Sequence, residues 1–332
     1  MNSSLKNDSI LLYFFSIYGR YPNFKEVLYY KRYFNQKEAR FMFGEMVQKY
    51  EQQENTLLSL TDQDLENHFQ DISSRGEITK NVYMTLTNFE DLAEDCHINN
   101  IKKEWDNAIH CNVYRYNDEE CRSLIEEHFD ASILSAYDKL IPGAFKSDIW
   151  RLCVLHLHGG VYADVHIKPE LKSTPNVILD SADYIFCIDY PSSPDYIYNA
   201  LMKFPKGSQL ALDILHRIAE NVANEIYPKS DLEISGPGLH GSVIKEVLGI
   251  EQFQEGFLEH NNEIYLFLKH TKHNKPKSNF EYSITFQRNL LFLCRYKDYR
   301  NDISNICKLE HYSTLFKKKM VYRTNTDSET NE

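Results

Sequence analysis

The chain has 332 residues, of which 42% are apolar, and it carries a formal net charge of −11 at pH 7. This length and composition are sufficient for a large buried core. The acidic balance argues against a nucleic-acid-binding protein, because such proteins need a basic surface. The seven cysteines are scattered, without a Cys-x-x-Cys pair, so they indicate neither a disulfide framework nor a thiolate zinc site.

The longest apolar run near the start, residues 10–17, is too short to cross a bilayer. No charged leader with a small-residue cleavage site accompanies this run. Together with the cysteine pattern, these features predict a cytoplasmic protein without a transmembrane segment.

The first part of the chain is poor in glycine and periodic. Apolar residues recur at the three- and four-residue spacing of a helix that buries one stripe, namely Ala39, Met42, Phe43, Met46, Val47 and Tyr50. We predict a helical extension over residues 1–72. It would pack as a cap on the main domain, or serve as an arm that contacts an acceptor or a partner.

From about residue 73, short β-rich runs alternate with helical ones, which is the pattern of an α/β sheet with crossover helices. The predicted strands cover residues 81–86, 111–116, 161–167, 184–188, 264–268 and 290–294. The predicted helices cover residues 118–129, 132–140, 146–158 and 208–223. We therefore predict an α/β domain over residues 73–321, followed by a polar, disordered tail over residues 322–332.

Two glycines, Gly159 and Gly160, end the predicted helix 146–158, because glycine readily adopts the left-handed backbone that follows a helix end. In the strand that follows, side chains alternate between two faces. One face is apolar, whereas the other carries Tyr162, Asp164 and His166. Open α/β sheets bind their ligands at such strand ends, and a carboxylate and an imidazole two residues apart can both reach one cation.

The helix before the glycines carries two charges, Asp148 and Arg151, which are three residues apart and so share one face. The helix is otherwise apolar, so these charges need partners. They would form a structural ion pair, or they would act together with Asp164 and His166 on a polar ligand. By contrast, His270 and His273 fall in the polar stretch 269–279, which we predict to be an exposed loop.

The segments Ala144-Phe-Lys-Ser-Asp-Ile-Trp-Arg151 and His158-Gly-Gly-Val-Tyr-Ala-Asp-Val-His166 resemble the hallmark of glycosyltransferase family 32. That family contains initiation-specific mannosyltransferases and capsular polysaccharide sugar transferases, and it is related to the sugar-transferring domain of large clostridial toxins. The resemblance extends over roughly residues 76–322, because further segments occur in family order, beginning at Ile78, Tyr116, Tyr198, Ser235 and His311.

The resemblance implies a GT-A fold, a Rossmann-like mixed α/β sheet flanked by helices. It also implies a retaining glycosyltransferase that moves a hexose from a UDP- or GDP-hexose donor to a glycan or glycolipid acceptor. The family uses an Asp-x-Asp motif to hold a divalent metal at the donor diphosphate. Such a metal stabilises the leaving group as negative charge develops on it.

The resemblance also implies roles for individual residues. The expected ligands of the transferred sugar are Asp148, Arg151 and Asn199. Tyr162 would lie beside the nucleotide, and Asp164 would bind both ribose and metal. The floor of the site would be Gly236 and Pro237, and the metal ligands would be Asp164, His166 and His311.

His166 departs from the family, which usually has its second aspartate at this position. The polypeptide N-acetylgalactosaminyltransferases are similar in using Asp-x-His to hold manganese, so the expected cofactor is manganese, with magnesium as the alternative. A catalytically inactive relative that binds a nucleotide sugar or a protein partner is the competing hypothesis. A metal hydrolase would need a further general base or a second metal, and the sequence contains no motif for either.

Overall fold

The computed structural model describes residues 80–324, except for residues 91, 93, 95, 110, 171–177, 180, 274–277, 287 and 307–309. The chain divides into two compact units, Met1–Thr79 and Lys80–Glu332. The predicted helical extension over residues 1–72 lies outside the described residues, so the fold below is that of the second unit.

A mixed sheet of ten strands, as counted in the described residues, forms the centre of this unit. Its order is β2-β1-β3-β6-β5-β8-β9-β10-β4, and β7 pairs with β8. The first three strands in this order are parallel, as are β5 and β8, whereas the other pairs are antiparallel. The strands are β1 (Lys80–Thr85), β2 (Cys111–Tyr116), β3 (Gly160–Ala163), β4 (Ile167–Pro169), β5 (Tyr184–Asp189), β6 (Leu201–Phe204), β7 (Gly256–His260), β8 (Glu263–Lys272), β9 (Phe280–Phe286) and β10 (Asn289–Tyr296).

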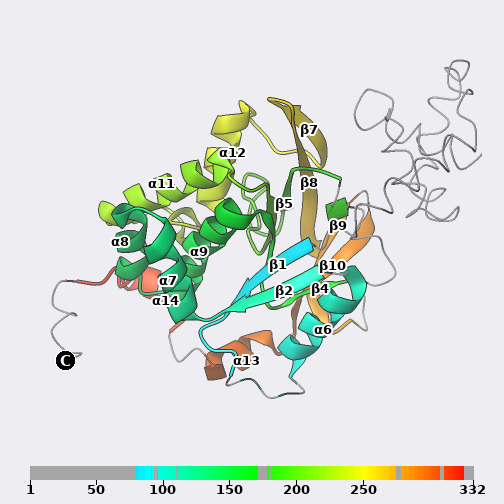
Figure 1. The fold of residues 1–332 in the computed structure, drawn as a ribbon, viewed down its shortest axis with the longest axis horizontal. Helices are drawn as coiled ribbons and strands as arrows, with labels where there is room; N and C mark the ends of the chain where they lie inside the picture. The colour runs from blue at the N-terminus through cyan, green and yellow to red at the C-terminus, as the bar shows by residue number, and fades with distance from the viewer. Residues whose placement is uncertain are drawn as a thin grey trace, which may run out of the picture. The chain divides into compact units, whose positions relative to one another are not determined.

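Helices cover both faces of the sheet (Figure 1). One face is covered by α7 (Asp118–His128), α8 (Ala131–Lys139), α9 (Gly143–His158), α11 (Gln209–Ala223) and α12 (Pro237–Leu248), and the other by α6 (His97–Ile109) and α13 (Tyr299–Ile306). The 3-10 helix η2 (Asp231–Glu233) and α14 (Tyr312–Lys317) pack against each other, and α14 also packs against α9. The prediction of a mixed α/β sheet flanked by helices is confirmed.

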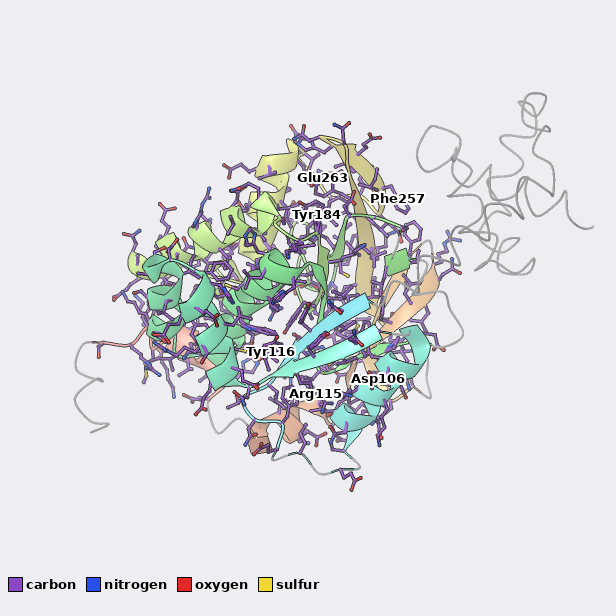
Figure 2. All side chains as sticks on the ribbon, viewed as in Figure 1. Asp106, Arg115, Tyr116, Tyr184, Phe257 and Glu263 are labelled. Carbon is purple, nitrogen blue, oxygen red and sulfur yellow. The ribbon has the colours of Figure 1, made fainter. Side chains whose placement is uncertain are left out.

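The two faces of the sheet bury separate apolar cores, because side chains alternate along each strand. Arg115 and Tyr116 lie next to each other at the end of β2 (Figure 2). The Tyr116 ring packs against Trp150 of α9, whereas the Arg115 guanidinium donates to Asn99 of α6. The helices are therefore anchored by consecutive residues of one strand.

Local signals set the start of α7 and the end of α9. Asn117 and Glu120 form a reciprocal capping box at the start of α7, which satisfies backbone N–H groups that the helix itself cannot. Gly159 follows α9 with φ +67°, and a Cβ there would lie only 2.6 Å from the backbone nitrogen of Lys206. Glycine therefore allows both the sharp exit from α9 and the close passage of a second chain segment.

The predicted strand over residues 161–167 is wrong in its second half. β3 ends at Ala163, and the chain turns before β4 begins at Ile167. The turn is closed by hydrogen bonds from Asp164 N to Ala200 O at 2.8 Å and from Ile167 N to Asp164 O at 2.9 Å. It occurs because Ile167 pairs with Cys294 of β10 rather than continuing beside β6. Asp164 and His166 are therefore turn residues.

At the carboxyl end, ordered structure continues into the predicted tail 322–332. Tyr322 is buried, forms an isolated β-bridge with Leu140, and donates its hydroxyl to the backbone oxygen of Ile226 at 2.6 Å. Residues 325–332 lie outside the described residues. Among the helices of the described part of the chain, none is both long and apolar enough to cross a membrane.

Candidate active site at the end of β3

Helix α9 places Asp148 and Arg151 under the end of β3. Both residues are buried, with 5% and 4% of their surface exposed. Arg151 Nη2 lies 3.1 Å from Asp148 Oδ1, and Arg151 Nε donates to the backbone oxygen of Ser147 at 3.0 Å. Arg151 Nη1 donates to the backbone oxygen of Asn199, just before β6. The guanidinium group is therefore fixed from two sides.

Asp148 accepts hydrogen bonds at both carboxylate oxygens. Asn199 Nδ2 donates to Oδ1, and the Ser235 hydroxyl donates to Oδ2, each at 2.8 Å. Burial raises the pKa of Asp148 to about 6, against the opposing effect of the Arg151 charge. The carboxyl group is thus held in one orientation by its partners.

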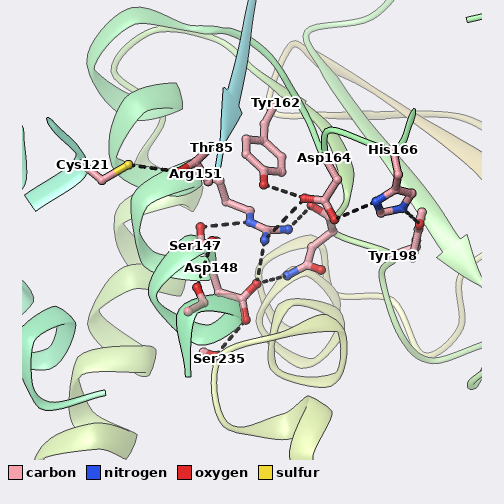
Figure 3. A network of polar contacts seen from close by, with 12 residues as sticks. Thr85, Cys121, Ser147, Asp148, Arg151, Tyr162, Asp164, His166, Tyr198 and Ser235 are labelled. Carbon is pink, nitrogen blue, oxygen red and sulfur yellow. Dashed lines mark hydrogen bonds and ion pairs between the residues drawn. The ribbon is translucent and has the colours of Figure 1, made fainter. Parts of the chain in front are cut away.

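Asp164 is the most accessible acidic group of this cluster, with 26% of its side chain exposed. Its Oδ1 accepts the hydroxyl proton of Tyr162 at 2.5 Å and lies 3.8 Å from Arg151 Nη2. The Tyr162 ring is almost fully buried, and the Arg151 guanidinium lies over it, 4.4 Å from its centroid. Tyr162 therefore packs against Arg151 and orients Asp164, and its ring does not face solvent (Figure 3).

His166 is buried beside Asp164 in the same turn. Its Nε2 lies 3.0 Å from the Tyr198 hydroxyl oxygen, and its Nδ1 lies 3.8 Å from Asp164 Oδ2 (Figure 3). Nδ1 is buried without a hydrogen-bond partner among the described residues. Burial lowers the pKa of His166 to about 4, although the Asp164 carboxylate opposes this shift. The imidazole is therefore neutral at pH 7.

This pair of donor atoms fits a divalent cation. A neutral imidazole nitrogen and a carboxylate oxygen 3.8 Å apart can both approach one ion, since such bonds are about 2.1 Å long. Imidazole combined with carboxylate is suited to manganese-like metals. In the described ranges, no group of three or more His, Cys, Asp or Glu side chains that could hold a metal occurs.

Two other predicted site residues, Gly236 and Pro237, lie at the start of α12. Gly236 lies directly under Asp148, because a Cβ at Gly236 would lie 3.4 Å from Asp148 Oδ2. Pro237 begins α12, and its backbone oxygen accepts from Ile197 N at 3.0 Å. Their predicted role as the floor of a site stays a prediction.

His311 lies at the start of α14, and its predicted role as a metal ligand stays a prediction. It precedes α14 as its N-cap, and its Nδ1 accepts from Ser313 N at 3.3 Å. Within the described residues, no hydrogen bond or ion pair connects His311 to Asp164 or His166. Its predicted role as a metal ligand thus has no support from these contacts.

The prediction that His270 lies in an exposed loop is wrong. His270 belongs to β8 and is buried, and its Nδ1 lies 2.8 Å from Oδ1 of the buried Asp189. The alternation of Leu266, Leu268 and His270 is the sequence signal that could have placed this histidine on the buried face. Its ring stacks on Tyr198, which in turn contacts His166.

Comparison with solved structures finds glycosyltransferases at low similarity. PaToxG glycosyltransferase aligns with 15% identity and a TM-score of 0.36, over 56% of this chain and 76% of that one. The ligand-free glycosyltransferase domain of the YGT toxin aligns with 12% identity and a TM-score of 0.29, over 73% and 67%. Its UDP-bound form aligns with 11% identity and a TM-score of 0.22, over 75% and 58%.

No curated protein sequence matches the chain. The family described as the glycosyltransferase sugar-binding region containing a DXD motif matches residues 45–184. This match begins inside the predicted extension 1–72, and it includes α9, β3 and the turn with Asp164 and His166. The buried Asp148–Arg151 pair and the Asp-x-His turn thus both fall within a region that is similar to sugar-binding glycosyltransferases.

Proposed function

We propose that the chain is a retaining glycosyltransferase that moves a hexose from a UDP- or GDP-hexose donor to a glycan or glycolipid acceptor, with a divalent cation as cofactor. The observation that carries this proposal is the convergence of Asp148, Arg151 and Asn199 on the end of β3, beside Asp164 and His166. The match of residues 45–184 to a DXD-containing glycosyltransferase region supports it.

Asp164 and His166 would hold the cation. When bound at a diphosphate, a divalent cation stabilises the negative charge that develops on the leaving group. Manganese fits this donor set better than magnesium, because an imidazole is a softer ligand than a carboxylate.

Asp148 and Arg151 would bind the transferred sugar. Asp148 is already oriented by Asn199 and Ser235, so its remaining acceptor capacity is directed without further rearrangement. Arg151 is likewise fixed before any ligand binds. Polar groups that are positioned in advance in a buried site stabilise developing charge more than mobile ones do.

The competing function, an inactive protein that binds a nucleotide sugar or a protein partner, is favoured by His166 in place of the usual aspartate. The neutral, unpartnered Nδ1 of His166 favours the enzyme instead, because it is the form of imidazole that coordinates metal.

Release of free nucleotide from a panel of nucleotide sugars, with manganese present, tests the proposal. We expect turnover of one donor by the wild type and its loss in Asp164→Asn, which keeps the shape of the side chain. Asp138→Asn is a matched control, because it breaks another Asp–Arg pair, with Arg122, on α7 and α8. Nucleotide binding without release of any sugar would assign the protein to the inactive class.

A further inference from the structure

We propose that Tyr198, supported by the buried pair His270 and Asp189, is a positioning residue that fixes the His166 imidazole with Nδ1 turned toward Asp164. This inference rests on the proposed cation site. It gives a role to three buried side chains, Tyr198, His270 and Asp189, that do not bind the sugar or the cation in the proposed function.

The end of β5 brings these side chains together. After Asp189 the chain folds back on itself, because Asp189 N donates to Tyr196 O at 2.9 Å and Tyr198 N donates to Cys187 O at 2.7 Å. Strand β8 runs parallel to β5 and places His270 directly beside Asp189. Tyr198 and His270 are thus both located by backbone pairing with one strand end.

His270 holds the Tyr198 ring in one orientation. The two rings stack with centroids 3.6 Å apart and planes 7° apart. Asp189 Oδ1 lies 2.8 Å from His270 Nδ1, and both residues are buried, with 4% and 5% of their surface exposed. His270 also contacts a second aromatic ring, that of Tyr282, with ring centroids 5.2 Å apart. The imidazole therefore acts as a fixed support for Tyr198.

Cation binding at Nδ1 of His166 requires the ring proton to be on Nε2. A proton on Nδ1 would be a buried donor without an acceptor, since Asp164 Oδ2 at 3.8 Å is too distant for a hydrogen bond. A proton on Nε2 is instead donated to the Tyr198 hydroxyl oxygen at 3.0 Å. In the Nε2–H tautomer, the ring proton is donated to the only hydrogen-bond partner of the ring in the described residues, and the Nδ1 lone pair is directed toward Asp164.

A histidine that coordinates a metal through one nitrogen is usually oriented by a hydrogen bond from the other, and loss of that partner typically weakens metal binding by about 10–100-fold. Tyr198 has this relation to His166. Residues from three separate segments, Asp189, Tyr198 and His270, thus hold His166 in place. A site that had lost cation binding would not need this arrangement.

Manganese binding by metal-free protein, measured by calorimetry and by electron paramagnetic resonance, tests the assignment without an activity assay. We expect Tyr198→Phe, which keeps the stacked ring and removes only the hydroxyl, to bind manganese about 10-fold or more weakly. Tyr184→Phe is the matched control, because it removes another tyrosine hydroxyl that contacts Ser208 at the opposite end of β5. Its affinity should equal that of the wild type.

The tautomer of His166 in the cation-bound protein is a second readout. Nitrogen-15 NMR of histidine-labelled wild type with zinc, a diamagnetic cation, bound should show the proton on Nε2, with the signal identified by its loss in His166→Gln. A proton on Nδ1, or manganese affinity in Tyr198→Phe equal to that of the Tyr184→Phe control, would overturn the inference while leaving the cation site in place. Failure of the wild type to bind manganese would overturn the cation site and this inference together.

Discussion

Arg151 and Asp164 belong to one cluster but differ in burial, so their replacement should have different consequences. Arg151 is 4% exposed and compensates the charge of the equally buried Asp148, whereas 26% of the Asp164 side chain is exposed. Removing one partner of a buried ion pair leaves an uncompensated charge, which typically costs about 3–5 kcal/mol. Arg151 is therefore both a structural residue and a candidate ligand of the sugar.

We expect Asp164→Ala to lower nucleotide release about 100-fold or more while changing the free energy of unfolding by only about 1 kcal/mol, the usual value of a lost hydrogen bond. Arg151→Ala should lower both activity and stability. Urea unfolding alongside the release assay separates the two effects. An Arg151→Ala protein as stable as the wild type would contradict the buried ion pair.

The buried His166 should make the stability of the metal-free protein depend on pH. Its folded pKa of about 4 lies below the ordinary value of 6.5, so the unfolded chain takes up a proton first as the pH falls. The stability contributed by neutral His166 is present above pH 6.5 and is lost between about pH 6.5 and 4, by up to about 3 kcal/mol. Asp148 has the opposite effect on stability. Because its folded pKa is raised to about 6, the folded protein takes up this proton before the unfolded chain does as the pH falls, which favours folding.

Comparison with His166→Asn isolates this contribution, because Asp148 is common to both proteins. Urea unfolding with a metal chelator present should show a smaller loss of stability in His166→Asn than in the wild type between pH 6.5 and 4. If stability falls equally with pH in the two proteins, His166 does not contribute to the loss, and the lowered pKa of the folded state is wrong.

At the scale of elements, ends that are set by neighbouring residues were predictable, whereas the end of β3 was not. The capping box at Asn117 and the glycine at 159 are local signals, because the residues that end a helix are its immediate neighbours. The turn at Asp164 and His166 has the alternation of a continuous strand. Only pairing of Ile167 with Cys294, far along the chain, ends that strand.

The same reason separates the site residues that were found from those that were missed. Asp148, Arg151, Asp164 and His166 lie close together in sequence, on one helix and the turn after it. The approach of His270 to Asp189 depends on the parallel pairing of β8 with β5, which a single sequence does not reveal.

Gly159 gives a prediction at this scale. Gly159→Ala should lower the free energy of unfolding by about 1–3 kcal/mol more than Gly249→Ala, because only at Gly159 would the new methyl group overlap a backbone atom. The backbone adds to this difference, because Gly159 has φ +67° and ψ −178°, a region open almost only to glycine, whereas Gly249 has the left-handed helical φ +64° and ψ 32°. Urea unfolding of the two variants measures the difference, and equal losses would contradict the close passage of Lys206.

At the scale of the whole molecule, the unit Lys80–Glu332 contains every candidate site residue. We expect a truncated chain that starts at residue 73 to retain measurable donor hydrolysis in the release assay. A second truncation that starts at residue 45 retains the whole matched region 45–184. Activity in the longer chain alone, with both chains folded, would show that residues 45–72 help to build the active site.

The sheet order places five strands, β6, β5, β8, β9 and β10, between β3 and β4, yet only residues 164–166 connect these two strands in the chain. So short a connection requires the sheet to curl until its far edge returns beside β3. The turn with Asp164 and His166 is therefore complete only after β10 has paired with β4. During synthesis, a nascent chain carries both proposed cation ligands long before β10 leaves the ribosome. The emerging protein thus cannot capture a metal in this geometry until almost the entire domain has been made and folded.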